Sequence, residues 1–453
     1  MKQRLIRGMI LLVLITLSWG IVYAEDPPVP PPPPAQPRSA PPISPQPPQR
    51  PGPTQPTPSP QPQPPSVATS EPEPQQPAAP APPSTEPPPV PTDVATSAQP
   101  EAPVPVLPAL MVNAHGMLVT NDGLPFEVRG VNYIQTSAAD LKLCPELHFG
   151  MVPGCPWDIE HIQADLDLLQ QQHVNTIRVF LNYYIFGASR LSIESYNTNI
   201  PLMRLEQLID EANRRGIYVL PVLLNKYPQH SFDDDAYNTA LAIHVRPVVE
   251  RLASRSGILA WDLFNEPDIG SPVDIRCWDW SNADHPLCFD LANERLAFLA
   301  RLVSDVRQLD PSRLMTISAA FAKNYFEPAG TNVRMADLVD LYAFHYYDNE
   351  PYDSGRYAQH WYYGAGFPSD FQRSIDELHL LNLQKPILMT EIGFPTGPGH
   401  TRQLPDLHRD LQTALQISRT SQTAGMILWP FQTNPEELTG GNLWLMRGQT
   451  SKR

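Results

Sequence analysis

The run Trp261-Asp262-Leu263-Phe264-Asn265-Glu266-Pro267 is a short, mostly apolar segment that ends on a glutamate. The run Met389-Thr390-Glu391-Ile392-Gly393 repeats this pattern later in the chain. Strands that are covered on both faces by helices are almost continuously apolar. We therefore expect each run to be a buried strand that presents a carboxylate at its carboxyl end.

Eight segments of this kind alternate with amphipathic, helix-like segments. The predicted strands are residues 126–131, 176–181, 217–224, 259–264, 314–318, 340–345, 386–390 and 425–429. The predicted helices are residues 159–172, 202–215, 236–255, 290–309, 370–382 and 404–421. This alternation predicts an α/β fold, a closed (β/α)8 barrel of the TIM type. An open doubly wound sheet is the alternative, but no Gly-rich phosphate-binding turn follows the first strand.

Two regions depart from the regular alternation. Before the first strand, Gly116-Met117-Leu118-Val119 and Asn121-Asp122-Gly123 predict a hairpin with a tight turn that closes the amino-terminal end of the barrel. Between the fifth and sixth strands, only residues 334–338 have a helical pattern. Because only 24 residues follow Trp429, we expect the eighth helix to be incomplete, missing or replaced.

Residues 1–24 have the features of a secretory signal peptide. Basic residues are followed by an apolar stretch over residues 9–22 and by small residues suited to cleavage after Ala24. The apolar stretch is short for a membrane span, and an uncleaved amino-terminal anchor is the alternative. We therefore expect an exported protein that is secreted, periplasmic or held at the cell surface.

Residues 25–108 form a proline-rich segment that contains 35 of the 56 prolines in the chain. Because this segment has almost no apolar surface to bury, we expect a disordered, solvated linker, extended by roughly 3 Å per residue. Its favoured role is that of a spacer that would allow association with the cell envelope. Pro-rich ligand motifs are the alternative. The remaining residues, 109–453, are expected to form the single barrel domain.

The charge of the predicted barrel domain argues against one class of partner. Residues 109–453 carry 40 acidic and 27 basic side chains. Because nucleic acids attract basic surfaces, we expect no nucleic-acid partner. Acidity is common among enzymes that act on neutral glycans and among exported proteins in general, so it does not choose between them.

The four cysteines form two local pairs of equal spacing, Cys144 with Cys155 and Cys277 with Cys288. In an exported protein this predicts two local disulfides, each contributing about 3 kcal/mol in the chain-entropy model. Three pairings are formally allowed. A zinc site is the alternative, but the close Cys and His spacings of such sites are missing. We expect no metal and no cofactor, and we interpret the acidic residues 233–235 as a helix start rather than a calcium site.

Glu266 and Glu391 follow the fourth and seventh predicted strands. In a barrel the carboxyl ends of all strands meet at one face, where active sites are built. Two facing carboxylates are what cleavage of a glycosidic bond requires, one to protonate the leaving oxygen and one to attack the sugar carbon. Each residue alone could equally be a surface or ion-paired glutamate.

Further polar and aromatic side chains fall at predicted strand ends. Arg178 could hold the carboxylate after strand seven in its ionised form, and a structural ion pair is the alternative. Asn265 could bind a sugar hydroxyl or serve as a turn residue. His345 and Tyr347 are placed to hydrogen-bond the carboxylates or the substrate. Trp429 could stack under a sugar ring, although a core role is also ordinary.

Taken together, these residues resemble the clan of retaining (β/α)8 glycoside hydrolases that includes family 5 cellulases and β-mannanases. Residues 122–133, which include Asn132, resemble the start of family 5 mannanase-like enzymes. The similarity covers residues 109–445. It implies that Glu266 is the acid/base and that Glu391 is the nucleophile of a double displacement. It also implies carboxyl groups ~5 to 5.5 Å apart.

One strand end departs from the cellulase pattern. Family cellulases usually have a histidine after strand three, where this chain has Leu223-Leu224-Asn225-Lys226. This sequence is closer to the mannanase-like subgroups, and it makes Asn225 a candidate substrate-binding residue. Aromatic residues in the loops could line a glycan groove, and loop packing around the disulfides is the alternative for half of them. These residues are Trp157, Trp278, Trp280, Trp361, Tyr362 and Tyr363.

The sequence therefore predicts an exported β-glycosidase that uses no cofactor and acts on a polysaccharide or oligosaccharide of the mannan or glucan type. A non-catalytic glycan-binding barrel is one alternative. Its signature would be the loss of a carboxylate or of Arg178, and neither is lost. A transglycosylase that uses the same carboxylate pair is the other alternative.

Overall fold

The computed structural model describes residues 104–134, 147–186, 199–228, 232–270, 286–326, 333–347, 363, 365–394 and 404–431. The predicted signal peptide and nearly all of the predicted proline-rich linker lie outside these residues, as does the position of the predicted eighth helix. In the described ranges, no helix combines the length and the apolar character needed to cross a lipid bilayer.

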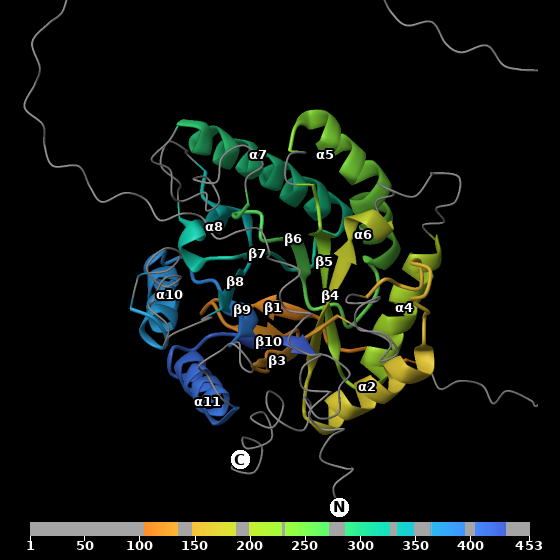
Figure 1. Ribbon diagram of the computed structural model, residues 1–453, viewed down its shortest axis with the longest axis horizontal. Helices are drawn as coiled ribbons and strands as arrows, with labels where there is room; N and C mark the ends of the chain where they lie inside the picture. The colour runs from red at the N-terminus through yellow and green to blue at the C-terminus, as the bar shows by residue number, and fades with distance from the viewer. Residues whose placement is uncertain are drawn as a thin grey trace, which may run out of the picture. The chain divides into compact units, whose positions relative to one another are not determined.

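Eight parallel strands form a closed barrel that is surrounded by helices (Figure 1), in the order β10-β3-β4-β5-β6-β7-β8-β9. This arrangement confirms the predicted (β/α)8 fold, and each predicted strand overlaps an observed one. The strands are β3 (Val128–Tyr133), β4 (Thr176–Asn182), β5 (Tyr218–Asn225), β6 (Trp261–Asn265), β7 (Met315–Ala319), β8 (Tyr342–Tyr347), β9 (Ile387–Gly393) and β10 (Gly425–Phe431).

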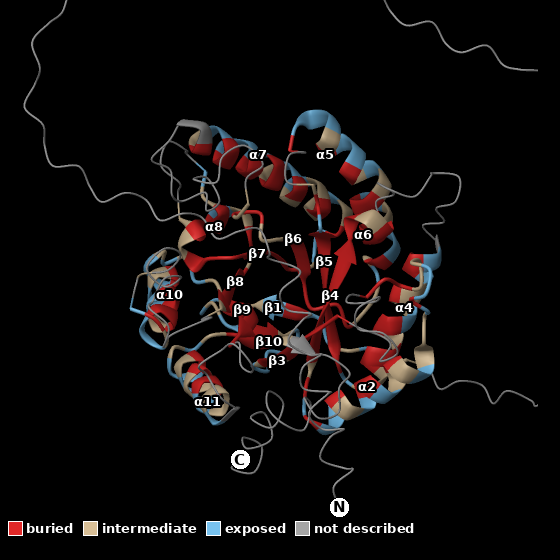
Figure 2. Cartoon of the chain, in the orientation of Figure 1, coloured by how far each residue is buried: buried red, intermediate tan, exposed pale blue. Residues whose placement is uncertain are grey.

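Helices follow the barrel strands and cover them from outside. They are α2 (Ile159–Gln171), α3 (Tyr183–Phe186), α4 (Asn199–Arg214), α5 (Asp234–Ala240), the π-helix η1 (Leu241–Val245), α6 (Arg246–Leu252), α7 (Pro286–Leu309), the 3-10 helix η3 (Ala322–Tyr325), α8 (Met335–Leu338), α10 (Ser369–Leu380) and α11 (Leu404–Thr420). Their inward faces are buried and many of their outward faces are exposed (Figure 2), as expected for amphipathic helices on a barrel.

The predicted helix over residues 236–255 is interrupted by a π turn. The π turn places the His244 imidazole 2.5 Å from the carbonyl oxygen of Leu223 in β5. At the start of this helical region, the Asp233 side chain accepts a hydrogen bond from the backbone N–H of Ala236. The acidic run that begins at Asp233 therefore caps a helix, as expected.

The predicted hairpin is present, and a second hairpin, which was not predicted, precedes it. β1 (Leu110–Val112) pairs antiparallel with β2 (Leu118–Thr120). The chain reverses over residues 113–117, where the Asn113 side chain accepts hydrogen bonds from two backbone N–H groups. Residues 121–123 form the predicted turn after β2, where the backbone N–H of Thr120 donates to the carbonyl oxygen of Leu124 (2.9 Å) and Val119 pairs antiparallel with Pro125. The turn before β2 was missed, because an Asn side chain can organise a turn by binding nearby backbone groups.

The hairpin closes the amino-terminal end of the barrel, as predicted. Leu110 and Leu118 pack in one apolar cluster with the first residues of the strands, among them Val128, Tyr218 and Leu388. The Tyr218 hydroxyl also donates to the carbonyl oxygen of Pro108 (2.8 Å). This packing leaves the opposite, carboxyl-terminal end of the barrel for polar side chains.

Barrel closure depends on a glycine at the start of β10. Gly425 pairs with Val128 and has a φ of +125°. A Cβ atom there would lie 2.1 Å from the carbonyl oxygen of Val128. We predict that Gly425→Ala lowers the free energy of unfolding by about 2 to 4 kcal/mol, because a close backbone contact adds to the strained φ. Urea unfolding would measure this.

Gly123→Ala is the matched control for Gly425→Ala. Gly123 also has a positive φ (+87°), but a Cβ atom added there would meet nothing within 4 Å. We expect a loss of only about 1 kcal/mol from backbone strain there. If the two variants were destabilised equally, the close approach of β10 and β3 would not be a constraint on the fold.

Candidate active site

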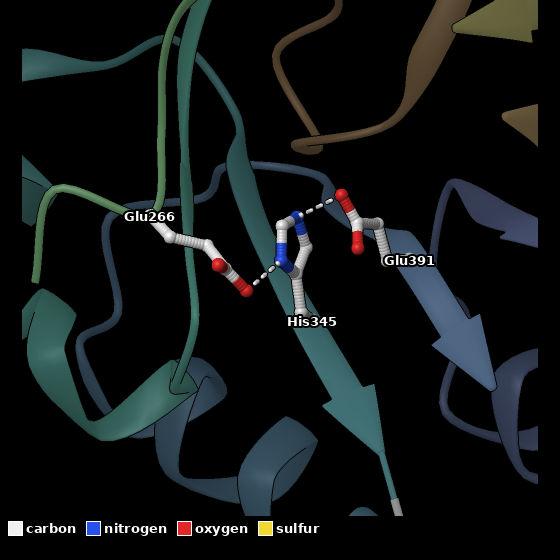
Figure 3. A group of neighbouring side chains, drawn as sticks. All are labelled: Glu266, His345 and Glu391. Atoms are coloured by element: carbon white, nitrogen blue, oxygen red, sulfur yellow. Dashed lines mark hydrogen bonds and ion pairs between the residues drawn. The ribbon is translucent and has the colours of Figure 1, made fainter. Parts of the chain in front are cut away.

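Two glutamates and a histidine meet at the carboxyl-terminal end of the barrel. Glu266 follows β6, His345 lies on β8 and Glu391 lies on β9. The imidazole lies between the two carboxyl groups (Figure 3). One nitrogen or oxygen atom from each residue lies within 4.8 Å of those from the other two. The fold therefore places both sequence-predicted glutamates in one small site.

Arg178 on β4 is fully buried and joins four side chains beneath this site. Its Nη1 donates to Glu391 Oε1 (2.6 Å) and to Asn132 Oδ1 (3.0 Å). Its Nε donates to Asp262 Oδ2 (2.9 Å), and its Nη2 donates to Asn265 Oδ1 (2.8 Å). Burial opposes the charged guanidinium, but the two carboxylates outweigh it and raise the pKa of Arg178.

Asp262, which the sequence analysis did not select, is central to this network. It is fully buried on β6 and accepts hydrogen bonds from the backbone N–H (3.1 Å) and the hydroxyl (2.6 Å) of Ser318. Thr390 Oγ1 lies 2.9 Å from the same hydroxyl. A signal for Asp262 was available, because an acid inside an apolar buried strand requires a partner.

Glu266 is held against a histidine that is neutral near neutral pH. Glu266 Oε1 lies 2.8 Å from His345 Nδ1. Burial raises the pKa of Glu266 to about 7, although Arg178 and Lys226 oppose this shift. Burial also lowers the pKa of His345 to about 4. Its other nitrogen, Nε2, lies 3.4 Å from Glu391 Oε1.

Glu391 is fixed by donors on both of its oxygens. Arg178 donates to Oε1, and the Tyr347 hydroxyl donates to Oε2. Tyr347 also packs edge-on against Trp429, with ring centroids 6.5 Å apart. The partly exposed Trp429 ring makes a second edge-on contact with Phe180. Tyr347 thus hydrogen-bonds one of the two carboxyl groups, as expected, and Trp429 lies beside it on β10, where stacking under a sugar ring stays a prediction.

The loop after Glu266 is held by hydrogen bonds of two charged side chains. Arg295 on α7 is buried and donates to three backbone carbonyl groups in residues 267–270. The Asp268 carboxylate accepts hydrogen bonds from the backbone N–H groups of Ala320 (2.8 Å) and Phe321 (3.2 Å). These contacts, which the sequence analysis did not anticipate, hold Glu266 in a left-handed backbone conformation with φ +51°.

Asn225 belongs to a separate polar chain at the same end of the barrel. Its Nδ2 donates to Asn182 Oδ1 (2.5 Å), and Asn182 in turn donates to the Tyr184 hydroxyl (3.2 Å). The Tyr184 hydroxyl lies 3.1 Å from Nδ1 of His148. This chain runs over the ends of β4 and β5, beside the network of Arg178.

Two of the six loop aromatics are held by neighbouring helices and loops. Trp157 stacks on Phe149 with centroids 5.7 Å apart, and the Tyr363 hydroxyl donates to Glu377. Both side chains are partly buried, so their role in a groove stays a prediction. Trp278, Trp280, Trp361, Tyr362, Cys144 and Cys277 lie outside the described residues. Neither Cys155 nor Cys288 is a free thiol, but the predicted pairing stays a prediction.

Among the described residues, one group of side chains has possible metal-ligand atoms that lie close together: Glu266, His345 and Glu391. The imidazole presents Nδ1 to one carboxylate and Nε2 to the other, so it bridges them rather than converging with both on one ion. The guanidinium of Arg178 already supplies a cation to Glu391. We assign no metal to this set.

Comparisons with known proteins agree with this architecture. The family model of cellulase (glycosyl hydrolase family 5) matches residues 139–433. A search of curated proteins found no match. Among solved structures, exo-β-1,4-mannosidase Op5Man5 from Opitutaceae bacterium strain TAV5 is similar, with a TM-score of 0.54 and 17% identity. The similarity covers 75% of this chain and 62% of the mannosidase, which is less than two thirds of its length.

Two further solved structures share the fold. The β-1,4-D-mannanase from Cryptopygus antarcticus has a TM-score of 0.51 and 16% identity, over 76% of this chain and 94% of the mannanase. The endo-1,4-β-mannanase from Eisenia fetida has a TM-score of 0.51 and 17% identity, over 75% of this chain and 94% of its own.

The ion pair between Arg178 and Asp262 makes a testable contribution to stability. We predict that Asp262→Asn lowers the free energy of unfolding by about 3 kcal/mol, because it leaves a buried guanidinium short of a carboxylate. Chemical denaturation would measure the loss. Glu250→Gln, which breaks an exposed pair with Arg246, should change stability by less than ~0.5 kcal/mol. Equal effects would contradict a special role for the buried pair.

Proposed function

The chain belongs to glycosyl hydrolase family 5, a family of retaining glycoside hydrolases, and on this premise we propose that it cleaves β-linked glycans by double displacement. In this proposal Glu391 is the nucleophile and Glu266 is the acid/base. The observation that carries the assignment is the separation of the two carboxyl groups. An oxygen atom of each lies within 4.8 Å of the other. Retaining enzymes hold their carboxyl groups about 5 to 5.5 Å apart, and inverting enzymes hold them farther apart.

In the first step, Glu391 attacks the anomeric carbon and forms a glycosyl ester while the glycosidic bond breaks. The leaving oxygen takes its proton from Glu266, whose pKa of about 7 keeps it largely protonated at mildly acidic pH. Arg178 and Tyr347 hold the attacking carboxyl group in place through their hydrogen bonds. Glu391 and Glu266 therefore have environments that suit opposite roles.

In the second step, Glu266 takes a proton from water, whose oxygen attacks the anomeric carbon and releases Glu391. The neutral imidazole of His345 suits both protonation states of Glu266. With its proton on Nε2, His345 accepts a hydrogen bond at Nδ1 from protonated Glu266. With its proton on Nδ1, it donates to the carboxylate. Asn265, held by Arg178, is placed to bind the hydroxyl next to the reacting carbon.

We propose β-mannan as the first substrate to test and β-glucan as the second. The solved structures that share the fold include mannan-degrading enzymes, and the third strand ends on Asn225 where family cellulases usually have a histidine. A screen on β-mannan, β-glucan and xylan would test this. New reducing ends would support hydrolysis, whereas lengthened products would support a transglycosylase.

Export and attachment to the cell envelope form a separate part of the proposal. The support for both comes from the sequence, namely the signal-like residues 1–24 and the proline-rich residues 25–108. Fractionation of cells that produce the full chain would test them. Activity confined to the cytoplasm would contradict this part without affecting the proposed chemistry.

The nucleophile and the acid/base predict different mutant behaviour. Glu391→Gln should reduce turnover by roughly 10³-fold or more on every substrate, because the covalent step is lost. Glu266→Ala should reduce turnover of natural glycans by about 10²- to 10⁴-fold. It should largely spare the first step with aryl glycosides that have a good leaving group. Burst kinetics would separate the two steps.

Unchanged thermal unfolding is the control for both variants. Retained activity in Glu391→Gln would remove the nucleophile assignment. A loss in Glu266→Ala that is the same for good and poor leaving groups would remove the acid assignment.

The environment of Glu266 predicts the pH dependence. The general acid works only while protonated, so kcat/KM for an unactivated glycan should fall as pH rises through about 7. His345 should not contribute to this decrease in kcat/KM, because its lowered pKa of about 4 keeps it neutral over this pH range. With an activated aryl glycoside, formation of the glycosyl-enzyme should lose most of this dependence. A limb that persists unchanged in Glu266→Ala would contradict the assignment.

A further inference from the structure

Two neighbouring strands of the barrel end in the same way. β5 ends in Leu224-Asn225 and is followed by Lys226, and β6 ends in Phe264-Asn265 and is followed by Glu266. In both, an apolar residue is followed by an asparagine and then by a long charged side chain. The parallel register pairs Leu224 with Phe264. Lys226 and Glu266 each come two residues after this pair, so they leave neighbouring strands at corresponding positions.

The backbone conformation is also the same at the two positions. Lys226 has a φ of +54° and Glu266 a φ of +51°, so both have the left-handed conformation that long side chains rarely adopt. Such conformations persist where surrounding contacts hold them, and they cluster at functional sites. Here both preceding asparagines bind side chains of β4. Asn225 donates to Asn182, and Asn265 accepts from Arg178.

The charged and titratable groups around Glu266 come from five strands or strand ends. They belong to Arg178 at β4, Lys226 after β5, Asp262 on β6, His345 on β8 and Glu391 on β9. Arg178 is already shared between two carboxylates, and His345 is neutral near neutral pH. Lys226 is exposed, and its charge lowers the pKa of Glu266, against the effect of burial. Lys226 is therefore a cation that acts on Glu266 from the rim of the site.

Resting on the proposed function, we propose that Lys226 is a positioning residue for the acid/base, whose ammonium group stabilises the carboxylate form of Glu266. That form arises when Glu266 gives its proton to the leaving oxygen, and the second step requires it. Burial favours the protonated form, which serves only the first step. The charge of Lys226 would offset part of this effect of burial, so that Glu266 could serve as acid in the first step and as base in the second.

The test compares Lys226→Met with Lys226→Arg. Both variants keep a long unbranched stem at the left-handed position, so backbone strain is matched and only the charge differs. In Lys226→Met we expect the basic limb of kcat/KM to move to higher pH by roughly 0.5 to 1 unit, because the carboxylate form of Glu266 loses a stabilising cation. Lys226→Arg should keep the wild-type profile.

A second measurement follows the glycosyl-enzyme directly. With an activated aryl glycoside, hydrolysis of the intermediate should be slower in Lys226→Met below pH 7, because less Glu266 is ionised to act as base. Lys323→Met is the control. It removes a lysine that follows β7 at the same end of the barrel and whose ammonium lies over the ring of Phe321. It should leave the pH profile unchanged.

The outcomes separate this inference from the proposed function. If Lys226→Met has the wild-type profile, or if Lys226→Arg shifts as much as Lys226→Met, the role of the Lys226 charge is overturned. In either case the double displacement stands as long as Glu391→Gln and Glu266→Ala behave as predicted. If those two variants retain full activity, the proposed function fails first, whatever the lysine variants show.

Discussion

The structure of the site depends on one buried guanidinium. Arg178 lies inside the barrel with no exposure, and such a cation is tolerated only where carboxylates and further acceptors surround it. Asp262, Glu391, Asn132 and Asn265 meet this requirement from three other strands. The same contacts that neutralise the arginine therefore orient Glu391 and Asn265, so stability and the proposed chemistry share one network.

The two glutamates differ because their surroundings differ, although both follow strands of the same barrel. Glu391 receives hydrogen bonds from a cation and a phenol, whereas Glu266 faces a buried, neutral imidazole. Burial dominates at Glu266 and raises its pKa, while the arginine is bound to Glu391 and Asp262. These surroundings suit the proposed roles of Glu391 as nucleophile and Glu266 as acid/base.

The sequence was sufficient for the strands and for the convergence of Glu266 and Glu391, because buried parallel strands have a distinct apolar pattern and a barrel aligns their ends. It was not sufficient for features that depend on side-chain partners. The turn organised by Asn113, the π turn at His244 and the buried role of Asp262 arise from contacts between distant or unpatterned residues. Arg295 was missed for the same reason, since its partners are backbone carbonyl groups.

The hairpin at the amino-terminal end of the barrel has a consequence for orientation. Because Pro108 and Leu110 join the domain there, the chain enters on the face opposite to Glu266 and Glu391. The point at which the chain enters the domain is therefore separated from both carboxyl groups by the height of the barrel.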